Sequence, residues 1–146
     1  VLAKQKALSV SCWQPHDLVI GADQILEMDG RIFSKPRELT SARETLVLLR
    51  GREHRLFSSV CVSRDGQRIW HKLDSAKLSM RNFSDKFLDD YLCSIGTQAL
   101  AGPGSYRIED VGSQLFSRIS GDHFTILGLP LIPLLDFLRV QGVLQS

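Results

Sequence analysis

The spacing of hydrophobic and polar residues predicts a helix, a strand and a hairpin in the first part of the chain. Residues 2–10 place apolar side chains at helical spacing. Residues 17–23 form a short continuous apolar run, which is typical of a strand covered on both faces. Residues 25–33 alternate around Asp29 and Gly30, a pair that favours a two-residue hairpin turn.

The middle of the chain predicts a second helix and a long hairpin. Residues 39–51 carry leucines on one helical stripe, Ser41 and Glu44 have the spacing of a capping box, and Gly51 stands where a helix ends. Residues 54–80 are rich in Val, Ile, Phe and Trp and are interrupted by an Asp-Gly pair. We therefore expect two further antiparallel strands after the helix.

The last part predicts two helices separated by strands. Residues 84–96 repeat apolar side chains on one face, with Ser84 as the N-cap. We expect strands at residues 106–110 and 113–120, and a final helix that carries the leucines of residues 131–138. This order predicts an α/β fold, with a mixed sheet flanked by helices.

Composition narrows the class of protein. A chain of 146 residues that is 43% hydrophobic fits a single domain over residues 1–146. A formal charge of +2 is too small for a nucleic-acid-binding face, and the most apolar run, residues 124–135, is shorter than the roughly 20 residues that span a membrane. Three cysteines without CxxC spacing suggest neither a disulfide framework nor a zinc site, so we expect a cytoplasmic protein.

Three residues are candidates for chemistry. Asp23 directly follows an apolar strand, a position where α/β sheets bind ligands and where a carboxylate can hold a metal or activate water. Lys35 precedes Pro36, which restricts its backbone and suits a phosphate contact, and Lys6 lies on the first predicted helix. The alternatives are a turn aspartate and solvated lysines. Nucleophile-elbow, P-loop and dinucleotide motifs do not occur.

Six segments in order resemble the Maf family of nucleoside triphosphate pyrophosphatases. They are AKQKALSV, LVIGADQIL, SKP, LRGREHRLFSSV, GSYRIED and ISGDHFTILGLPLIPLLDFLR. The resemblance implies a fold similar to the inosine-triphosphate pyrophosphatases, with two lobes around a nucleotide cleft. It also implies hydrolysis of a nucleoside triphosphate to a monophosphate and pyrophosphate with a divalent metal cation, Mg²⁺ or alternatively Mn²⁺. Asp23 matches the family's catalytic residue and metal ligand, while Lys6 and Lys35 match its phosphate-contacting lysines.

Other positions differ within the family. The chain begins downstream of the family's Ser-Pro-Arg-Arg segment, so we expect a longer natural protein with a further strand and phosphate-binding loop. Ala99 and Leu100 stand where the family carries a charged pair. Glu109 and Gln24 are similar to the branch that hydrolyses 7-methyl-GTP, and a carboxylate can accept hydrogen bonds from the N1–H and 2-amino group of guanine. Both residues are therefore expected to bind the substrate.

The predicted function has an alternative. The main hypothesis is a metal-dependent pyrophosphatase that removes modified or non-canonical triphosphates. The family has also been linked to septum formation, so the alternative is a non-catalytic nucleotide-binding regulator of cell division. The expected partner is a nucleoside triphosphate, without nucleic acid or membrane. The family also suggests a homodimer, at whose surface Trp13 and Trp70 are candidates.

Overall fold

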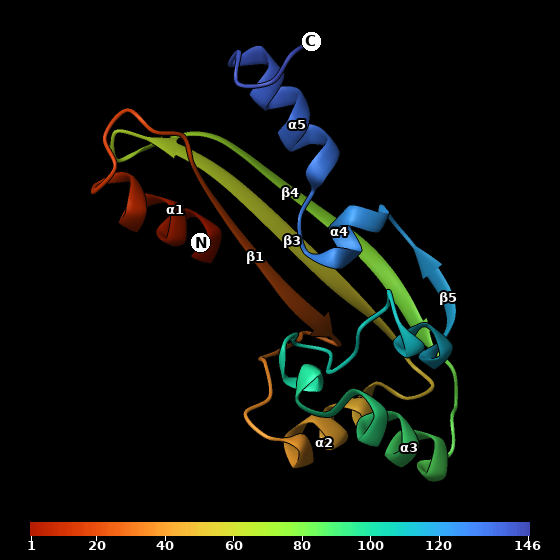
Figure 1. Ribbon diagram of the computed structural model, residues 1–146. Helices are drawn as coiled ribbons and strands as arrows, with labels where there is room; N and C mark the ends of the chain where they lie inside the picture. The colour runs from red at the N-terminus through yellow and green to blue at the C-terminus, as the bar shows by residue number, and fades with distance from the viewer. The chain divides into compact units, whose positions relative to one another are not determined.

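The computed structural model describes residues 1–146 and shows an α/β fold built on five strands (Figure 1). The strand order is β2-β1-β3-β4-β5. The strands are β1 (Val19–Met28), β2 (Arg31–Phe33), β3 (Glu53–Arg64), β4 (Gln67–Met80) and β5 (Phe116–Ser120). The helices are α1 (Leu2–Ser11), α2 (Leu39–Leu49), α3 (Asp85–Ile95), α4 (His123–Leu127) and α5 (Leu131–Val140), with 3-10 turns η1 (Gly96–Leu100) and η2 (Val111–Leu115). The predicted α/β sheet flanked by helices is confirmed.

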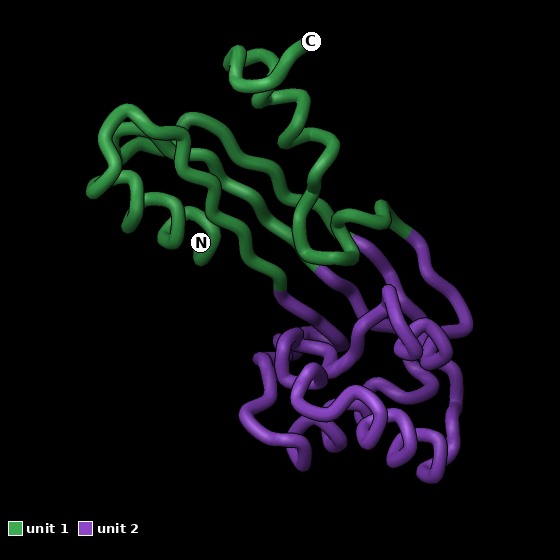
Figure 2. The backbone as a smooth tube through the Cα atoms, viewed as in Figure 1, with its two compact units in different colours: residues 1–24, 57–75, 121–146 green, residues 25–56, 76–120 purple.

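The chain divides into two compact units (Figure 2). Unit 1 comprises residues 1–24, 57–75 and 121–146, and unit 2 comprises residues 25–56 and 76–120. Strands β1, β3 and β4 each contribute residues to both units. The expectation of a single domain, with two lobes around a nucleotide cleft, stays a prediction.

In unit 1, strand β3 is covered on both faces. Cys61 packs with Ala3 and Ala7 of α1 in one buried cluster. Its neighbours Val60 and Val62 belong to another cluster, which includes residues of α5. Because successive side chains of a strand point to opposite faces, α1 and α5 lie on opposite sides of β3. This explains why three successive residues of this strand, Val60, Cys61 and Val62, are all apolar and buried.

In unit 2, the helix ends follow the expected chemistry. Ser84 caps α3 by accepting a hydrogen bond from the backbone N–H of Phe87, and Gly96 ends the helix with a positive φ of 53°. The hairpin between β1 and β2 turns at Asp29 and Gly30, both with positive φ. These predicted boundaries are confirmed.

Three local predictions are wrong. Asp23 does not follow a strand, because β1 continues without a break to Met28 and carries Asp23 within it.

The other two concern a helix cap and a strand. Ser41 does not cap α2, because the helix begins at Leu39 and its N-cap is Glu38, which makes no side-chain cap hydrogen bond. Residues 106–110 form no strand, since this segment turns and bonds to side chains: the backbone N–H of Arg107 donates to the hydroxyl of Tyr91. The predicted strand at 113–120 is half correct, because η2 occupies its first residues and β5 the rest.

The states of the cysteines and the lengths of the helices concern two further expectations, on disulfides and on membrane spans. All three cysteines are free: Cys12 in unit 1 and Cys93 in unit 2 are exposed, whereas Cys61 is buried. None of the helices has the length and apolar character that crossing a membrane requires.

Candidate active site

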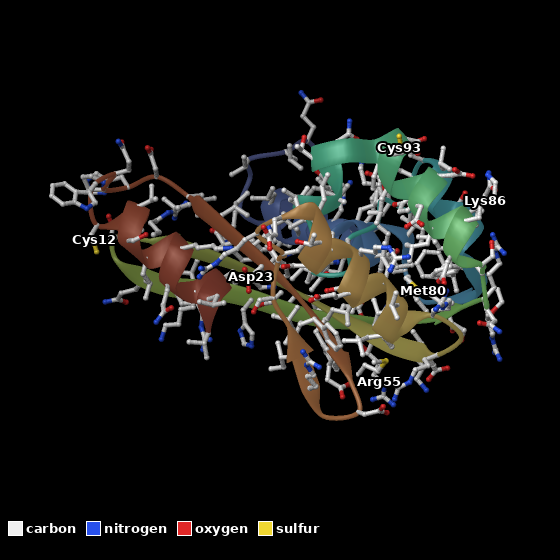
Figure 3. All side chains as sticks on the ribbon, turned by 90° about the horizontal axis from the view of Figure 1, so that it is seen from below. Cys12, Asp23, Arg55, Met80, Lys86 and Cys93 are labelled. Atoms are coloured by element: carbon white, nitrogen blue, oxygen red, sulfur yellow. The ribbon has the colours of Figure 1, made fainter.

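Lys6 and Asp23 form a close ion pair in unit 1. The Lys6 ammonium lies 2.6 Å from Oδ1 of Asp23 and also donates to the backbone carbonyl of Ala22 at 3.1 Å. The Asp23 side chain is 19% exposed and that of Lys6 is 57% exposed, so the pair is reachable from solvent. Figure 3 shows Asp23 on β1 beside α1. The ammonium group of Lys6 is therefore held at the carboxylate of Asp23, the candidate that the sequence indicates.

Gly21 explains why α1 comes close enough for this contact. A Cβ atom at Gly21 would lie 2.4 Å from the backbone oxygen of Ala3 and 2.7 Å from the backbone nitrogen of Ala7. Both distances are shorter than any tolerated contact, so only glycine allows this approach of helix and strand. Because Lys6 belongs to the same helical turn, the glycine sets the position of its ammonium over Asp23.

Gln24 lies next to Asp23 but its amide is engaged inside unit 1. The amide nitrogen is 2.9 Å from the carbonyl oxygen of Ile126, 3.1 Å from Oγ of Ser58 and 3.3 Å from the carbonyl oxygen of Thr125. These contacts join β1 to β3 and α4. The structure therefore brings Asp23 and Lys6 together, whereas the amide of Gln24 takes part in a hydrogen-bond network with β3 and α4.

Ser58, Thr125 and Asp74 complete this network, and sequence reasoning missed all three. The Ser58 hydroxyl donates to the carbonyl of Thr125 at 2.6 Å, and the Thr125 hydroxyl donates to Oδ2 of Asp74 at 2.7 Å. Ser58 and Thr125 are fully buried. Their one sequence signal was the presence of hydroxyl residues inside otherwise apolar segments, where a buried polar group requires a partner.

Lys35 and Glu109 belong to unit 2. Lys35 is exposed in the connection between β2 and α2. Glu109 lies in the turn after Tyr106, where its Oε1 accepts from Nε of Arg107 at 3.0 Å; Arg107 also donates to Oε1 of Gln98 at 2.7 Å. The carboxylate of Glu109 thus has a cation beside it on the surface.

His54 anchors the segment that leads to Glu109. Its Nε2 lies 2.8 Å from the hydroxyl of Tyr106, and both rings lie against Phe116. Burial lowers the pKa of His54 to about 4, because the charged imidazolium would lose its hydration. Burial also raises the pKa of Tyr106 well above its usual value. The pair is therefore neutral near pH 7, and Nδ1 of His54 is buried without a hydrogen-bond partner.

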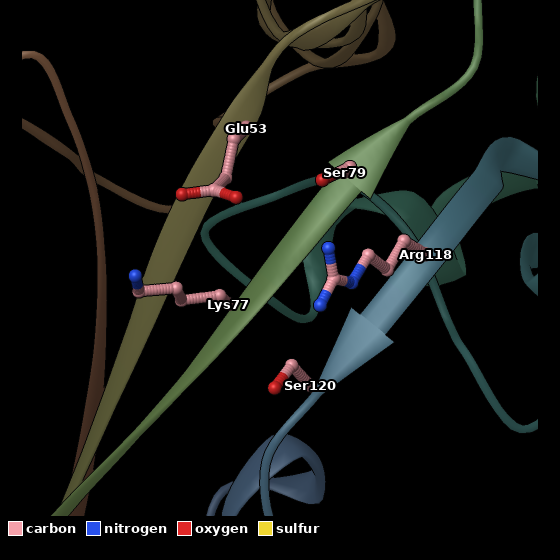
Figure 4. Close-up of a pocket in the computed structure, with 5 residues that line it drawn as sticks. All are labelled: Glu53, Lys77, Ser79, Arg118 and Ser120. Carbon is pink, nitrogen blue, oxygen red and sulfur yellow. The ribbon is translucent and has the colours of Figure 1, made fainter.

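A polar hollow of about 170 Å³ lies on β3, β4 and β5 in unit 2 (Figure 4). Lys77 pairs with Ser120 and Ser79 with Arg118 across β4 and β5, so these side chains share one face, and Glu53 joins them from β3. Its charges are of both signs and its side chains are exposed or half-buried. We assign this hollow no part in the chemistry of Asp23.

The donor atoms around Asp23 limit how a divalent metal could bind. The described residues offer no group of three or more His, Cys, Asp or Glu side chains that could hold a metal ion. Lys6 contacts Oδ1 of Asp23, and Asp23 is the acidic residue here that would hold a metal. Mg²⁺ is commonly bound by one or two carboxylates together with water and substrate phosphates. A divalent cation held at Asp23 would therefore need water or phosphate oxygens as its other ligands.

Comparison of the sequence with known proteins places the chain in one family. The family model described as Maf-like protein matches residues 1–141, and the chain belongs to this family. A nucleoside triphosphate pyrophosphatase of Rhodospirillum rubrum is 53% identical over 99% of this chain and 72% of its own length. One of Paramagnetospirillum magneticum is 51% identical, over 99% and 74%. A 7-methyl-GTP pyrophosphatase of Rhizobium etli is 44% identical, over 100% and 73%.

Proposed function

We propose that the protein is a nucleoside triphosphate pyrophosphatase, a hydrolase that acts on an acid anhydride and releases a nucleoside monophosphate and pyrophosphate. The observation that carries this proposal is the 2.6 Å contact between Lys6 and Asp23, in a member of a family with relatives named for this activity. A carboxylate with an ammonium beside it supplies the two functions the reaction needs, which are orientation of water and stabilisation of phosphate charge.

The proposed chemistry is a displacement at the α-phosphorus. The oxygen of a water molecule forms a bond to this phosphorus, and the bond to the oxygen that bridges the α- and β-phosphates breaks. Pyrophosphate leaves with the bridging oxygen, and the proton of the water passes to Asp23 and then to solvent. Lys6 and Lys35 contact the phosphate oxygens and offset their charge.

A divalent cation fits this proposal as the partner of Asp23 and the phosphates. Mg²⁺, or alternatively Mn²⁺, would lower the pKa of a bound water and neutralise phosphate charge. Asp23 is the residue of this chain that would hold it.

For the base, we propose a modified purine such as that of 7-methyl-GTP. Support comes from the carboxylate of Glu109, which can accept from two donors of guanine, and from the relative of Rhizobium etli. The side chains of Arg107 and Glu109 are 40% and 42% exposed. An ion pair this exposed is weak and easily exchanged for a ligand. Gln24 is expected to contribute to the same recognition, and its amide nitrogen also bonds to Ser58 and to the carbonyl of Ile126.

We also propose a cytoplasmic, homodimeric enzyme. Three free thiols suit a reducing compartment. Trp13 is 83% exposed and remains a candidate for a dimer surface, whereas Trp70 stacks on Phe137 at 5.0 Å within unit 1. Light scattering of the purified protein tests the dimer.

Pyrophosphate release by the intact protein, with and without Mg²⁺, tests the proposed activity. We expect metal-dependent release that falls at least a thousandfold in Asp23→Asn, because the amide removes the charge that orients water and metal, whereas Asp17→Asn changes exposed surface just before β1 and retains activity. Binding of nucleotide without hydrolysis by the unaltered protein would refute the enzyme and favour the non-catalytic regulator.

A further inference from the structure

The guanidinium of Arg107 is held from two sides in unit 2. Its Nε donates to Oε1 of Glu109 at 3.0 Å, and its Nη2 lies 3.0 Å from the same oxygen, so the pair does not use Oε2 of the carboxylate. Its Nη1 donates to Oε1 of Gln98 at 2.7 Å, and Gln98 belongs to η1 rather than to the segment of Glu109. The charge of Arg107 therefore stays beside Glu109 even when the carboxylate turns to a ligand.

The backbone at Arg107 is fixed independently of its side chain. Its N–H donates to the hydroxyl of Tyr91 at 3.2 Å, and Tyr91 is buried in α3. A Cβ atom at Gly112 would lie 2.0 Å from the carbonyl oxygen of Arg107, so the chain of η2 lies directly against this residue. A substitution that alters only the side chain of Arg107 should therefore leave the turn, and Glu109 with it, in place.

Three charged side chains follow one another closely in this turn. Arg107 is positive, Glu109 is negative, and so is Asp110, whose Oδ1 accepts the N–H of Val111 at 2.8 Å. Two negative charges and one positive charge leave a negative excess of one, which doubles if the arginine charge is removed. Because these side chains are exposed or half-buried, solvent weakens their field, and we expect them to change the binding of a charged ligand several-fold.

We propose that Arg107 is a second specificity-determining residue for the base, which offsets the charge of Glu109 and so restrains the preference for a positively charged base. The inference rests on the proposed function and deepens it, because Glu109 accepts the hydrogen bonds while Arg107 sets how strongly charge counts.

Guanine and 7-methylguanine separate these two contributions. Both bases present an N1–H and a 2-amino group to a carboxylate, so their hydrogen bonds to Glu109 are alike. The methyl group at N7 gives only the second base a positive charge. A change in the charge beside Glu109 should therefore act on one base and spare the other.

The test compares Arg107→Gln with Arg107→Lys and Arg43→Gln in the intact protein, slightly below neutral pH so that the methylated base keeps its N1 proton. Glutamine removes the charge and lysine keeps it, while Arg43 is a similarly exposed arginine of unit 2 that pairs with Asp89. We expect the ratio of kcat/KM for 7-methyl-GTP to that for GTP to rise about threefold to tenfold in Arg107→Gln. The ratio should stay within about twofold in the other two variants.

Salt distinguishes an effect of charge from a merely structural role. Raising the salt from about 0.1 M to about 1 M shortens the Debye length from about 10 Å to about 3 Å, so the difference between Arg107→Gln and the unaltered enzyme should shrink. An unchanged or lower ratio in Arg107→Gln, an equal rise in Arg107→Lys, or a difference that persists at high salt would overturn the inference.

Binding measurements keep the inference decidable if the proposed function fails. If the unaltered protein hydrolyses no triphosphate, that function is wrong, and calorimetric titration with 7-methyl-GMP and with GMP replaces the kinetics. The ratio of the two dissociation constants should then shift about threefold to tenfold towards 7-methyl-GMP in Arg107→Gln. Equal ratios in the two proteins, or no binding of either nucleotide to the unaltered protein, would refute the role of Arg107.

Discussion

The two units hold their candidate site residues in different ways. In unit 1, the strand that carries Asp23 is held by hydrogen bonds to β3 and α4. Two residues of this network, Ser58 and Thr125, are fully buried. In unit 2, Glu109 is held by an exposed ion pair with Arg107. Buried networks are rigid because breaking them leaves unpaired polar groups, whereas exposed ion pairs exchange readily. The comparison suggests a fixed centre for chemistry and an adaptable one for the base.

In unit 2, the backbone next to Glu109 is anchored by hydrogen bonds although the Glu109 side chain is exposed. Tyr106 is bonded to His54, and the hydroxyl of Tyr91 receives the N–H of Arg107. The backbone of the turn is therefore anchored while the carboxylate at its surface is not. The side chain of Glu109 can therefore exchange its partner while the backbone of the turn stays in place.

Among changes in unit 1 that spare Asp23 itself, Gly21→Ala should reduce kcat and stability most. A Cβ at this position would meet the backbone of α1, so the helix must move and Lys6 with it. We expect kcat to fall about a hundredfold and the free energy of unfolding to fall by about 1–3 kcal/mol. Gly102→Ala is the control, because a Cβ there meets nothing within 4 Å. Full activity of Gly21→Ala would show that the close approach does not set the site.

The anchor of unit 2 should make stability depend on pH. Burial depresses the pKa of His54 from 6.5 to about 4, so the unfolded chain binds the proton more readily between these values. The stability that His54 contributes is present above about pH 6.5 and is lost as the pH falls towards 4. Between about pH 7 and pH 5 this loss amounts to about 2 kcal/mol.

Urea unfolding at the two pH values measures this dependence. The decrease in the free energy of unfolding should be about 2 kcal/mol larger for the unaltered protein than for His54→Gln, which cannot take up the proton. Equal decreases in the two proteins would mean that His54 is solvated and does not anchor the segment.

The smallest effect on stability, and a selective one on function, is expected for Glu109→Gln. Loss of an exposed ion pair should leave the melting temperature unchanged. The kcat/KM ratio of 7-methyl-GTP to UTP should fall about tenfold, because the amide can no longer accept from both guanine donors. Glu44→Gln, on the exposed side of α2, controls for the change of charge. An unaltered ratio would remove Glu109 from base recognition.

Periodic segments could be predicted from the sequence, and short or side-chain-bonded ones could not. The helix after Ser84 and the hairpins at Asp-Gly pairs carry signals within a few residues, and these predictions are confirmed. Helix α4 has five residues, too few for a period, and the segment 106–110 looked like a strand although its hydrogen bonds go to distant tyrosine and histidine side chains. Tertiary contacts of this kind override local propensity.

The candidate site divides in the same way. The apolar run before Asp23 and the predicted helix around Lys6 make both residues candidates, the family resemblance supports both, and the structure brings them into contact. The bonds of Gln24 join residues separated by more than 100 positions, which no local pattern reveals. Glutamine beside an aspartate is suited to binding substrate as well as backbone, and a substrate contact of Gln24 stays a prediction.

Two of the three cysteines can be labelled with fluorescent dyes, because only these two are exposed. Cys12 and Cys93 are exposed, one in each unit, while Cys61 is buried against α1. Maleimide dyes should therefore react at the two exposed thiols and spare the third, giving a donor and an acceptor without engineered sites. Energy transfer between them, followed as nucleotide is added, would report directly whether substrate changes the distance between the two units.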